Sequence, residues 1–112
     1  MEKNDRRRHP RAPVNRPGRI RVSDGPVTHV QLMNISPRGA SLFYSTPLPV
    51  GTTVELNFRL NGSQEPLNLA GHVLQSHLRG ESHWIRVVFM NPPGSVTKVI
   101  SEFAQNRSAA AN

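Results

Sequence analysis

Apolar residues alternate with polar ones in several short stretches of the chain, and turn residues separate these stretches. The clearest alternation covers residues 53–60, where the apolar positions would share one face of a half-buried strand: Val54, Leu56, Phe58 and Leu60. The same reasoning predicts six strands in all, over residues 19–23, 27–35, 40–44, 53–60, 67–78 and 84–90. Short loops between them favour an antiparallel sandwich or barrel over strand–helix–strand units.

A helical periodicity follows the last predicted strand. Asn91-Pro-Pro-Gly94 interrupts the strand, and Ser95 is a candidate N-cap for a helix. Apolar side chains then recur at the i, i+3, i+4 and i+7 spacing: Val96, Val99, Ile100 and Phe103. We therefore expect one short helix whose apolar stripe covers an end of the β core, followed by a frayed tail over residues 107–112.

Length and composition narrow the class of protein. A chain of 112 residues fits one domain, which we divide into a basic arm (1–17) and a β core with its helix (18–106). The absence of cysteine excludes disulfides, thiolate catalysis and cysteine-based zinc sites. No apolar run approaches the roughly 18 residues that cross a bilayer, and the start of the chain lacks a signal-peptide pattern. We expect a cytoplasmic protein.

The sequence gives no support to an enzyme. It contains no Gly-x-Ser-x-Gly elbow, no phosphate-binding glycine loop before a helix, and no close pair of carboxylates. The histidines lack the i, i+4 spacing of a helical metal site and are interpreted as exposed residues at strand ends: His9, His29, His72, His77 and His83. His77 and His83 flank a turn, so they are the pair that a hairpin could bring together. We predict no catalytic residues, no metal and no cofactor.

Positive charge is concentrated at the start of the chain. The first 21 residues carry eight basic residues against Glu2 and Asp5, which leaves +6 of the total net charge of +7. Nearly all of the basic residues are arginines: Arg6, Arg7, Arg8, Arg11, Arg16, Arg19 and Arg21, with Lys3 as the exception. The planar guanidinium fork suits phosphate oxygens and the O6/N7 edge of guanine. Prolines 10, 13 and 17 indicate an arm that is mobile without a ligand. A solvated basic tail and non-specific attraction to nucleic acid remain open.

A second motif, Asn34-Ile-Ser36-Pro-Arg-Gly39, follows the arm. Asn34 and Ser36 lie two apart, so on an extended strand they point the same way. Pro37 begins a turn, and Gly39 suits a positive φ or the close approach of a ligand. Taken alone, the motif also fits an ordinary turn in which Asn34 or Ser36 bonds to the local backbone.

Together the two motifs resemble the signature of PilZ domains: Arg7-x-x-x-Arg11 followed by Asn34-x-Ser36-x-x-Gly39. The resemblance extends over roughly residues 6–105 and includes the stretches 48–56 and 85–90. It implies a six-stranded antiparallel β-barrel with a C-terminal helix. It also implies a receptor for cyclic di-GMP in which Arg7 and Arg11 grip guanine edges and phosphates, often of an intercalated pair of ligand molecules.

On the same resemblance, Asn34, Ser36 and Gly39 would meet the other guanine edges and the phosphates. Asparagine stands where the family more often has aspartate, so the contact with guanine N–H groups would be neutral and weaker. Further candidate contacts are Arg6, Arg8 and Arg38. The resemblance implies that binding moves the arm and signals to a partner protein that the sequence does not name.

Two other functions compete with the receptor. One is a PilZ-like protein-interaction domain that binds no nucleotide, which the complete set of motif residues argues against. The other is a nucleic-acid-binding β-barrel, but its strands would be expected to present interleaved aromatic side chains, and aromatics are only 5% of this chain.

Overall fold

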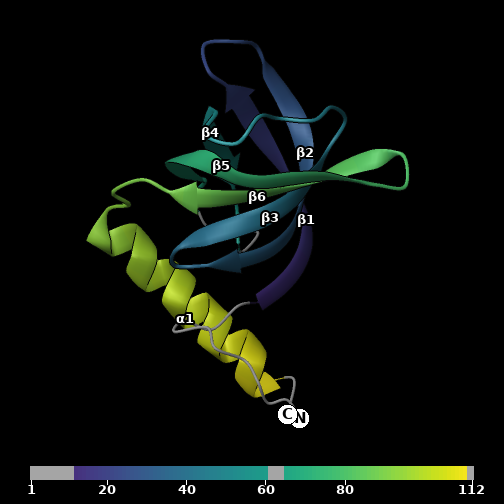
Figure 1. Cartoon of the computed structure of the whole chain (residues 1–112). Helices are drawn as coiled ribbons and strands as arrows, with labels where there is room; N and C mark the ends of the chain where they lie inside the picture. Colours follow the sequence, from purple (N-terminus) through teal and green to yellow (C-terminus); the bar gives the residue numbers. More distant parts are fainter. Residues whose placement is uncertain (1–11, 61–64, 111–112) are drawn as a thin grey trace.

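The computed structural model describes residues 12–60 and 65–110. This part of the chain forms six strands and one helix: β1 (Ala12–Val22), β2 (Val27–Ser36), β3 (Gly39–Tyr44), β4 (Thr53–Phe58), β5 (Leu67–Arg79), β6 (Ser82–Phe89) and α1 (Gly94–Ala110). The strands close into a barrel in the order β1-β2-β3-β6-β5-β4, and every neighbouring pair is antiparallel (Figure 1). The predicted six-stranded antiparallel barrel with a C-terminal helix is confirmed.

The barrel interior is filled mainly by aliphatic side chains from the inward rows of the strands. In β4 the predicted alternation holds, because Val54, Leu56 and Phe58 are buried while Thr53 and Glu55 are exposed. The largest fully buried apolar side chains come from five of the strands, the segment after β4 and the helix: Ile20, Leu32, Ile35, Leu42, Leu56, Leu60, Ile85 and Ile100. Burial of this apolar surface is the main stabilising term of the fold.

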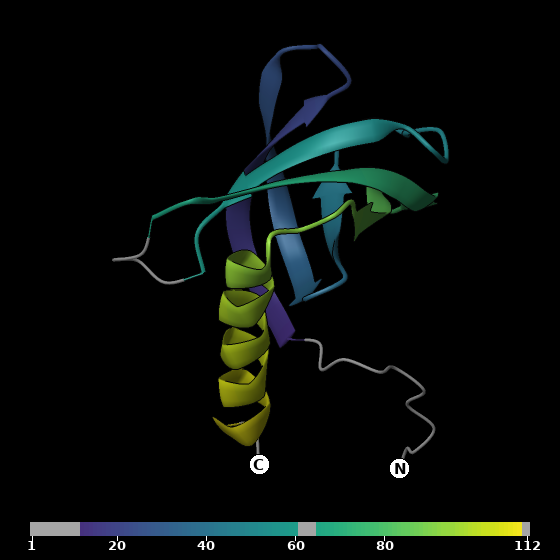
Figure 2. The ribbon, with the colours of Figure 1, turned by 90° about the vertical axis from the view of Figure 1, so that its left-hand side faces the viewer.

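Helix α1 lies beneath one end of the barrel and packs against β1 and β2 (Figure 2). Ile100 and Ala104 are fully buried there, and the rest of the predicted apolar stripe packs against the core: Val96, Val99 and Phe103. The stripe prediction is therefore confirmed. The helix continues to Ala110, past residue 107 where fraying was expected. No helix of the described residues is long and apolar enough to cross a membrane.

The N-cap prediction for α1 was wrong. The carbonyl oxygen of Pro93 accepts hydrogen bonds from the backbone N–H groups of Val96 and Thr97, both at 3.0 Å. Pro93 therefore occupies the capping position, and Ser95 lies inside the first turn. Thr97 adds a hydrogen bond from its hydroxyl to the carbonyl oxygen of Gly94, at 2.9 Å.

Strand β1 begins at Ala12, so it includes residues 12–17, which the sequence pattern assigned to the arm. Pro13 and Pro17 are accommodated because this first half of β1 pairs only with β2, whereas pairing with β4 starts at Arg19. A strand with one unpaired side tolerates residues that lack an N–H group. A register shift, with Asn15 at φ 49°, bends the strand between the two prolines. Residues 1–11 lie outside the described residues, so the mobility of the arm stays a prediction.

Candidate functional site

The Asn34–Gly39 motif forms the tight connection between β2 and β3. Ser36 ends β2 and pairs with Gly39, the first residue of β3, so that Pro37 and Arg38 make the turn. The Ser36 hydroxyl accepts a hydrogen bond from the Arg38 backbone N–H at 3.3 Å and donates to the Gly39 carbonyl oxygen at 3.4 Å. Ser36 thus bonds to the local backbone, as the ordinary-turn interpretation expects.

The close approach of strand β6 requires a glycine at position 39. A Cβ atom built on Gly39 would lie 2.2 Å from the carbonyl oxygen of Val87 in β6, closer than any real contact of this kind. The positive-φ glycines of the described chain are Gly51 and Gly80, so of the two reasons considered for Gly39 a positive φ does not apply. A close approach does explain this glycine, and the backbone of β6 makes that approach.

A β-bulge turns Asn34 toward the outside of the barrel. Val30 and Leu32 face the core with the usual spacing of two, but the next inward residue is Ile35, three positions later. The register shift between Leu32 and Asn34 accounts for the extra residue. Asn34 and Ser36 therefore flank the buried Ile35 on the outer side of β2. No described residue forms a hydrogen bond with the Asn34 side chain, so its amide can bind a ligand.

Strand pairing brings the end of the arm to this motif. Ala12, the residue after Arg11 in the sequence, pairs with Ile35, between Asn34 and Ser36. Consecutive Cα atoms are about 3.8 Å apart, so the chain enters the barrel beside the motif. Four candidate arginines precede this point and lie outside the described residues: Arg6, Arg7, Arg8 and Arg11.

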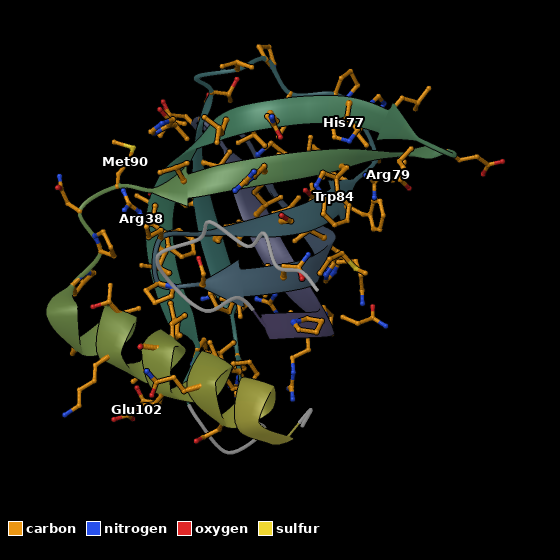
Figure 3. The ribbon with its side chains drawn as sticks, turned by 60° about the horizontal axis from the view of Figure 1, so that its bottom comes forward. Arg38, His77, Arg79, Trp84, Met90 and Glu102 are labelled. Atoms are coloured by element: carbon orange, nitrogen blue, oxygen red, sulfur yellow. The ribbon has the colours of Figure 1, made fainter. Side chains whose placement is uncertain are left out.

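Arg38 is exposed in the β2–β3 turn, and its backbone is fixed to the end of β6 by a 2.8 Å hydrogen bond from the Phe89 N–H to the Arg38 carbonyl oxygen. Figure 3 shows Arg38 at the end of the barrel that also carries Met90, an exposed apolar residue. The Arg38 side chain is therefore presented to solvent from a well-held turn.

An aromatic and cationic cluster on the outer face of β3, β6 and β5 has no counterpart in the sequence motifs. The ring of Trp84 meets that of Phe43 edge-on, with centroids 5.1 Å apart and planes at 79°. The Arg79 guanidinium lies 4.6 Å from the centroid of the Trp84 ring (Figure 3). His77 pairs with Trp84 across the β5–β6 hairpin. These residues are brought together by the register between neighbouring strands, which a local sequence pattern does not reveal.

The two hairpin histidines are not brought together. His77 pairs with Trp84 and His83 pairs with Leu78, so the two histidines stand at adjacent positions whose side chains leave opposite faces of the hairpin. His77 is exposed as expected, but His83 is partly buried, and its Nδ1 atom is buried without a hydrogen-bond partner. The described residues contain no group of three or more metal-binding side chains that could hold an ion.

A shallow pocket of about 190 Å³ lies between β1 and β4 and contains none of the motif residues. Strand β4 stands across the closed barrel from β3, so this pocket and the motif are on different sides. The lining mixes polar and aliphatic side chains, and it includes an ion pair between Arg21 and Glu55 at 4.0 Å. We therefore place the candidate site outside this pocket, on the outer surface around the partly exposed Asn34.

Comparison with known proteins identifies a family and supports the fold. The family model of the PilZ domain matches residues 5–105, a range that contains both motifs. No curated protein sequence matches the chain. Among solved structures, the inhibitor of motility MotI/DgrA of Bacillus subtilis is similar with a TM-score of 0.82 at 14% identity, covering 98% of this chain and 55% of that one.

Two further similar structures are complexes with cyclic di-GMP. The PilZ domain of YcgR from Escherichia coli has a TM-score of 0.68 at 15% identity and covers 96% of this chain and 95% of that one. PlzA of Borreliella burgdorferi has a TM-score of 0.68 at 13% identity, covering 89% of this chain and 41% of that one. At these identities the likeness shows the fold. The chain spans about half the length of MotI/DgrA and less than half of PlzA.

Proposed function

We propose that this chain, which belongs to the PilZ domain family, is a receptor that binds cyclic di-GMP on the outer face of its barrel. The observation that carries the proposal is the pairing of Ala12 with Ile35, which brings the end of the Arg7-x-x-x-Arg11 segment to the Asn34–Gly39 motif. The cyclic di-GMP complexes of the similar YcgR and PlzA structures support the choice of ligand.

Each motif residue takes a chemical role in this proposal. The Asn34 amide oxygen accepts from the N1–H and N2–H groups of a guanine, and the arginine forks of Arg7 and Arg11 bind phosphate oxygens and guanine O6/N7 edges. Ser36 uses its proton and one lone pair in the turn, which leaves a second lone pair for a ligand donor. Gly39 keeps the turn against β6, so that Asn34 and Arg38 are held in place.

Binding would act as a switch through the arm. Ordering a mobile arm costs about 1–2 kcal/mol per residue, and charge-assisted hydrogen bonds of about 1.5–3 kcal/mol each offset much of that cost. The position of the arm then depends on the ligand, and a downstream protein partner that contacts the arm would read the change. Arg6, Arg8 and Arg38 add to the positive field around the ligand. Cyclic di-GMP binds either singly or as an intercalated pair, and the titration described next reports the stoichiometry.

Calorimetric titration with cyclic di-GMP tests the proposal, with cyclic di-AMP and GTP as ligand controls. We expect Arg7→Ala and Arg11→Ala to abolish measurable binding while circular dichroism shows a folded barrel. Arg59→Ala is the matched control, because this exposed arginine follows β4 on the other side of the barrel from β3. Wild-type affinity in both arm variants would overturn the role of the arm. No binding by the wild-type protein would overturn the receptor function and favour a PilZ-like protein-interaction domain.

A further inference from the structure

The outward-facing positions of four strands form one continuous row that starts at the motif. Asn34 of β2 pairs with Ser41 of β3, Ser41 pairs with Arg86 of β6, and Arg86 pairs with Gln75 of β5. Neighbouring strands are about 4.8 Å apart, so the backbone of Arg86 lies about 10 Å from that of Asn34. Register thus places a further arginine, Arg86, beside the candidate site, from a segment far along the sequence.

Among the described residues, no carboxylate compensates the positive charge of Arg86. The side chain is partly buried, and its neighbours in the row, Ser41 and Gln75, are neutral. None of the described carboxylates lies within ion-pair distance of Arg86, and the described ion pair of the barrel joins Arg21 and Glu55 between β1 and β4. Removing a cation partly from water without a partner is unfavourable, and a bound anion would offset this cost.

The polar groups along the row divide into two kinds. Asn34 offers an amide oxygen that can accept from guanine N–H groups, whereas Arg86 and the exposed Gln75 offer hydrogen-bond donors. Donors of this kind suit the oxygens of a phosphodiester. Ser41, which lies between Asn34 and Arg86 in the row, is only 1% exposed, so the ligand would contact the two longer side chains on either side of it. A single nucleotide can reach both, with its base edge at Asn34 and its phosphate at Arg86. Because Arg86 stands in a strand, its backbone is already ordered before the ligand arrives.

We propose that Arg86 is a fixed cationic contact of the ligand site, binding a phosphodiester of the cyclic di-GMP molecule whose guanine edge meets Asn34. This inference rests on the proposed receptor function and adds a residue that neither sequence motif contains. The site extends from the β2–β3 turn across β3 to β6.

The chain carries its own reporter for this contact. Trp84 is the single tryptophan of the sequence and stands two residues before Arg86, on the same outer face of β6. Two residues of a strand span about 6.6 Å, so a nucleotide bound at Arg86 lies next to the indole. We therefore expect cyclic di-GMP to change the tryptophan emission of the folded protein.

The test compares Arg86→Ala and Arg86→Lys with the wild-type protein and with Arg59→Ala, using calorimetry and tryptophan fluorescence. We expect Arg86→Ala to weaken cyclic di-GMP binding by about 10- to 100-fold, because a charge-assisted hydrogen bond is lost. Arg86→Lys should stay within about threefold of wild type, since an ammonium binds phosphate as a point charge. Arg59→Ala should bind as the wild type does. Thermal unfolding by circular dichroism checks each fold, and Arg86→Gln replaces the alanine variant if that variant unfolds.

The outcomes separate the inference from the function on which it rests. If wild type binds and Arg86→Ala binds within twofold of it, the role of Arg86 is wrong and the receptor function stands. Equal loss in the lysine and alanine variants overturns the phosphate contact, because charge is then not what the ligand uses. If wild type shows neither heat of binding nor a fluorescence change, both proposals fail.

Discussion

Gly39→Ala should destabilise the barrel in the absence of any ligand. The added Cβ would lie 2.2 Å from the Val87 carbonyl oxygen, whereas ordinary contact begins at 3.4 Å, so β3 and β6 must separate locally by the difference of 1.2 Å. The Cβ is fixed to the backbone of β3 and the carbonyl oxygen belongs to the backbone of β6, so no side-chain rotation can relieve the contact. The pairing of Gly39 with Val88 and the 2.8 Å hydrogen bond from the Phe89 N–H to the Arg38 carbonyl oxygen resist the separation.

The expected loss of stability has two parts, the steric cost of the added methyl group and the loss of the Arg38–Phe89 hydrogen bond. Forcing an extra methyl group into a packed site costs about 1–3 kcal/mol. A separation of this size also stretches the Arg38–Phe89 hydrogen bond beyond its range, which costs about 0.5–1.5 kcal/mol. The free energy of unfolding should therefore fall by about 2–4 kcal/mol, and the midpoint temperature by roughly 8–16 °C for a domain of this size.

Urea unfolding of the ligand-free protein, followed by far-ultraviolet circular dichroism, measures this loss. Gly94→Ala is the matched control, because a Cβ on Gly94 meets no atom within 4 Å and this residue begins α1. That control should be neutral or more stable by up to about 1 kcal/mol. A Gly39→Ala barrel as stable as wild type would refute the steric reasoning.

Three other substitutions test the site and the fold. Asn34→Asp should tighten cyclic di-GMP binding by about 5- to 10-fold in calorimetry, because an ionised carboxylate accepts guanine N–H groups more strongly than an amide; equal or weaker binding would contradict the assigned contact. Arg79→Ala should shift the emission of Trp84 and lower the free energy of unfolding by about 0.5–1 kcal/mol, since it removes the cation from the indole face; an unchanged spectrum would show that the guanidinium does not rest there in solution. Ile100→Ala should lower the free energy of unfolding by about 2–5 kcal/mol, because this side chain is fully buried between α1 and the barrel; a loss below 1 kcal/mol in urea would mean that the helix is not docked.

Hydrophobic periodicity was sufficient to predict most of the fold. The bounds of β2 to β6 agree with the predicted strands within two residues, and the helical stripe is buried as expected. The start of β1 was missed because the unfavourable effect of proline in a sheet depends on whether both sides of the strand are paired. Pro13 and Pro17 lie in the part of β1 that does not pair with β4. The extent of this pairing is set by how the barrel closes, and a short stretch of sequence does not reveal it.

Only the part of the site that lies within one short stretch of sequence could be predicted from the sequence. The Asn34–Gly39 motif could be recognised, but the reason for Gly39 is the carbonyl of Val87, which only the pairing of β3 with β6 reveals. Counting alternate positions also fails across a bulge. The register shift before Asn34 reverses which face that residue occupies, and a second shift between Val73 and Gln75 does the same in β5.

Those two bulges, in β2 and β5, and the regular pairing of β3 with β6 between them create the row on which Arg86 stands. If β2 kept strict alternation after Leu32, Asn34 would point into the core while Arg86 still pointed out, and no ligand could touch both side chains. The bulge in β2 is therefore what unites a local turn motif with a distant arginine on one surface. It follows that removing the bulge residue Met33 should abolish cyclic di-GMP binding or unfold β2, whereas a conservative Met33→Leu substitution should leave the row and the affinity intact. Binding of wild-type strength by a folded Met33 deletion would show that the outer row is not the site.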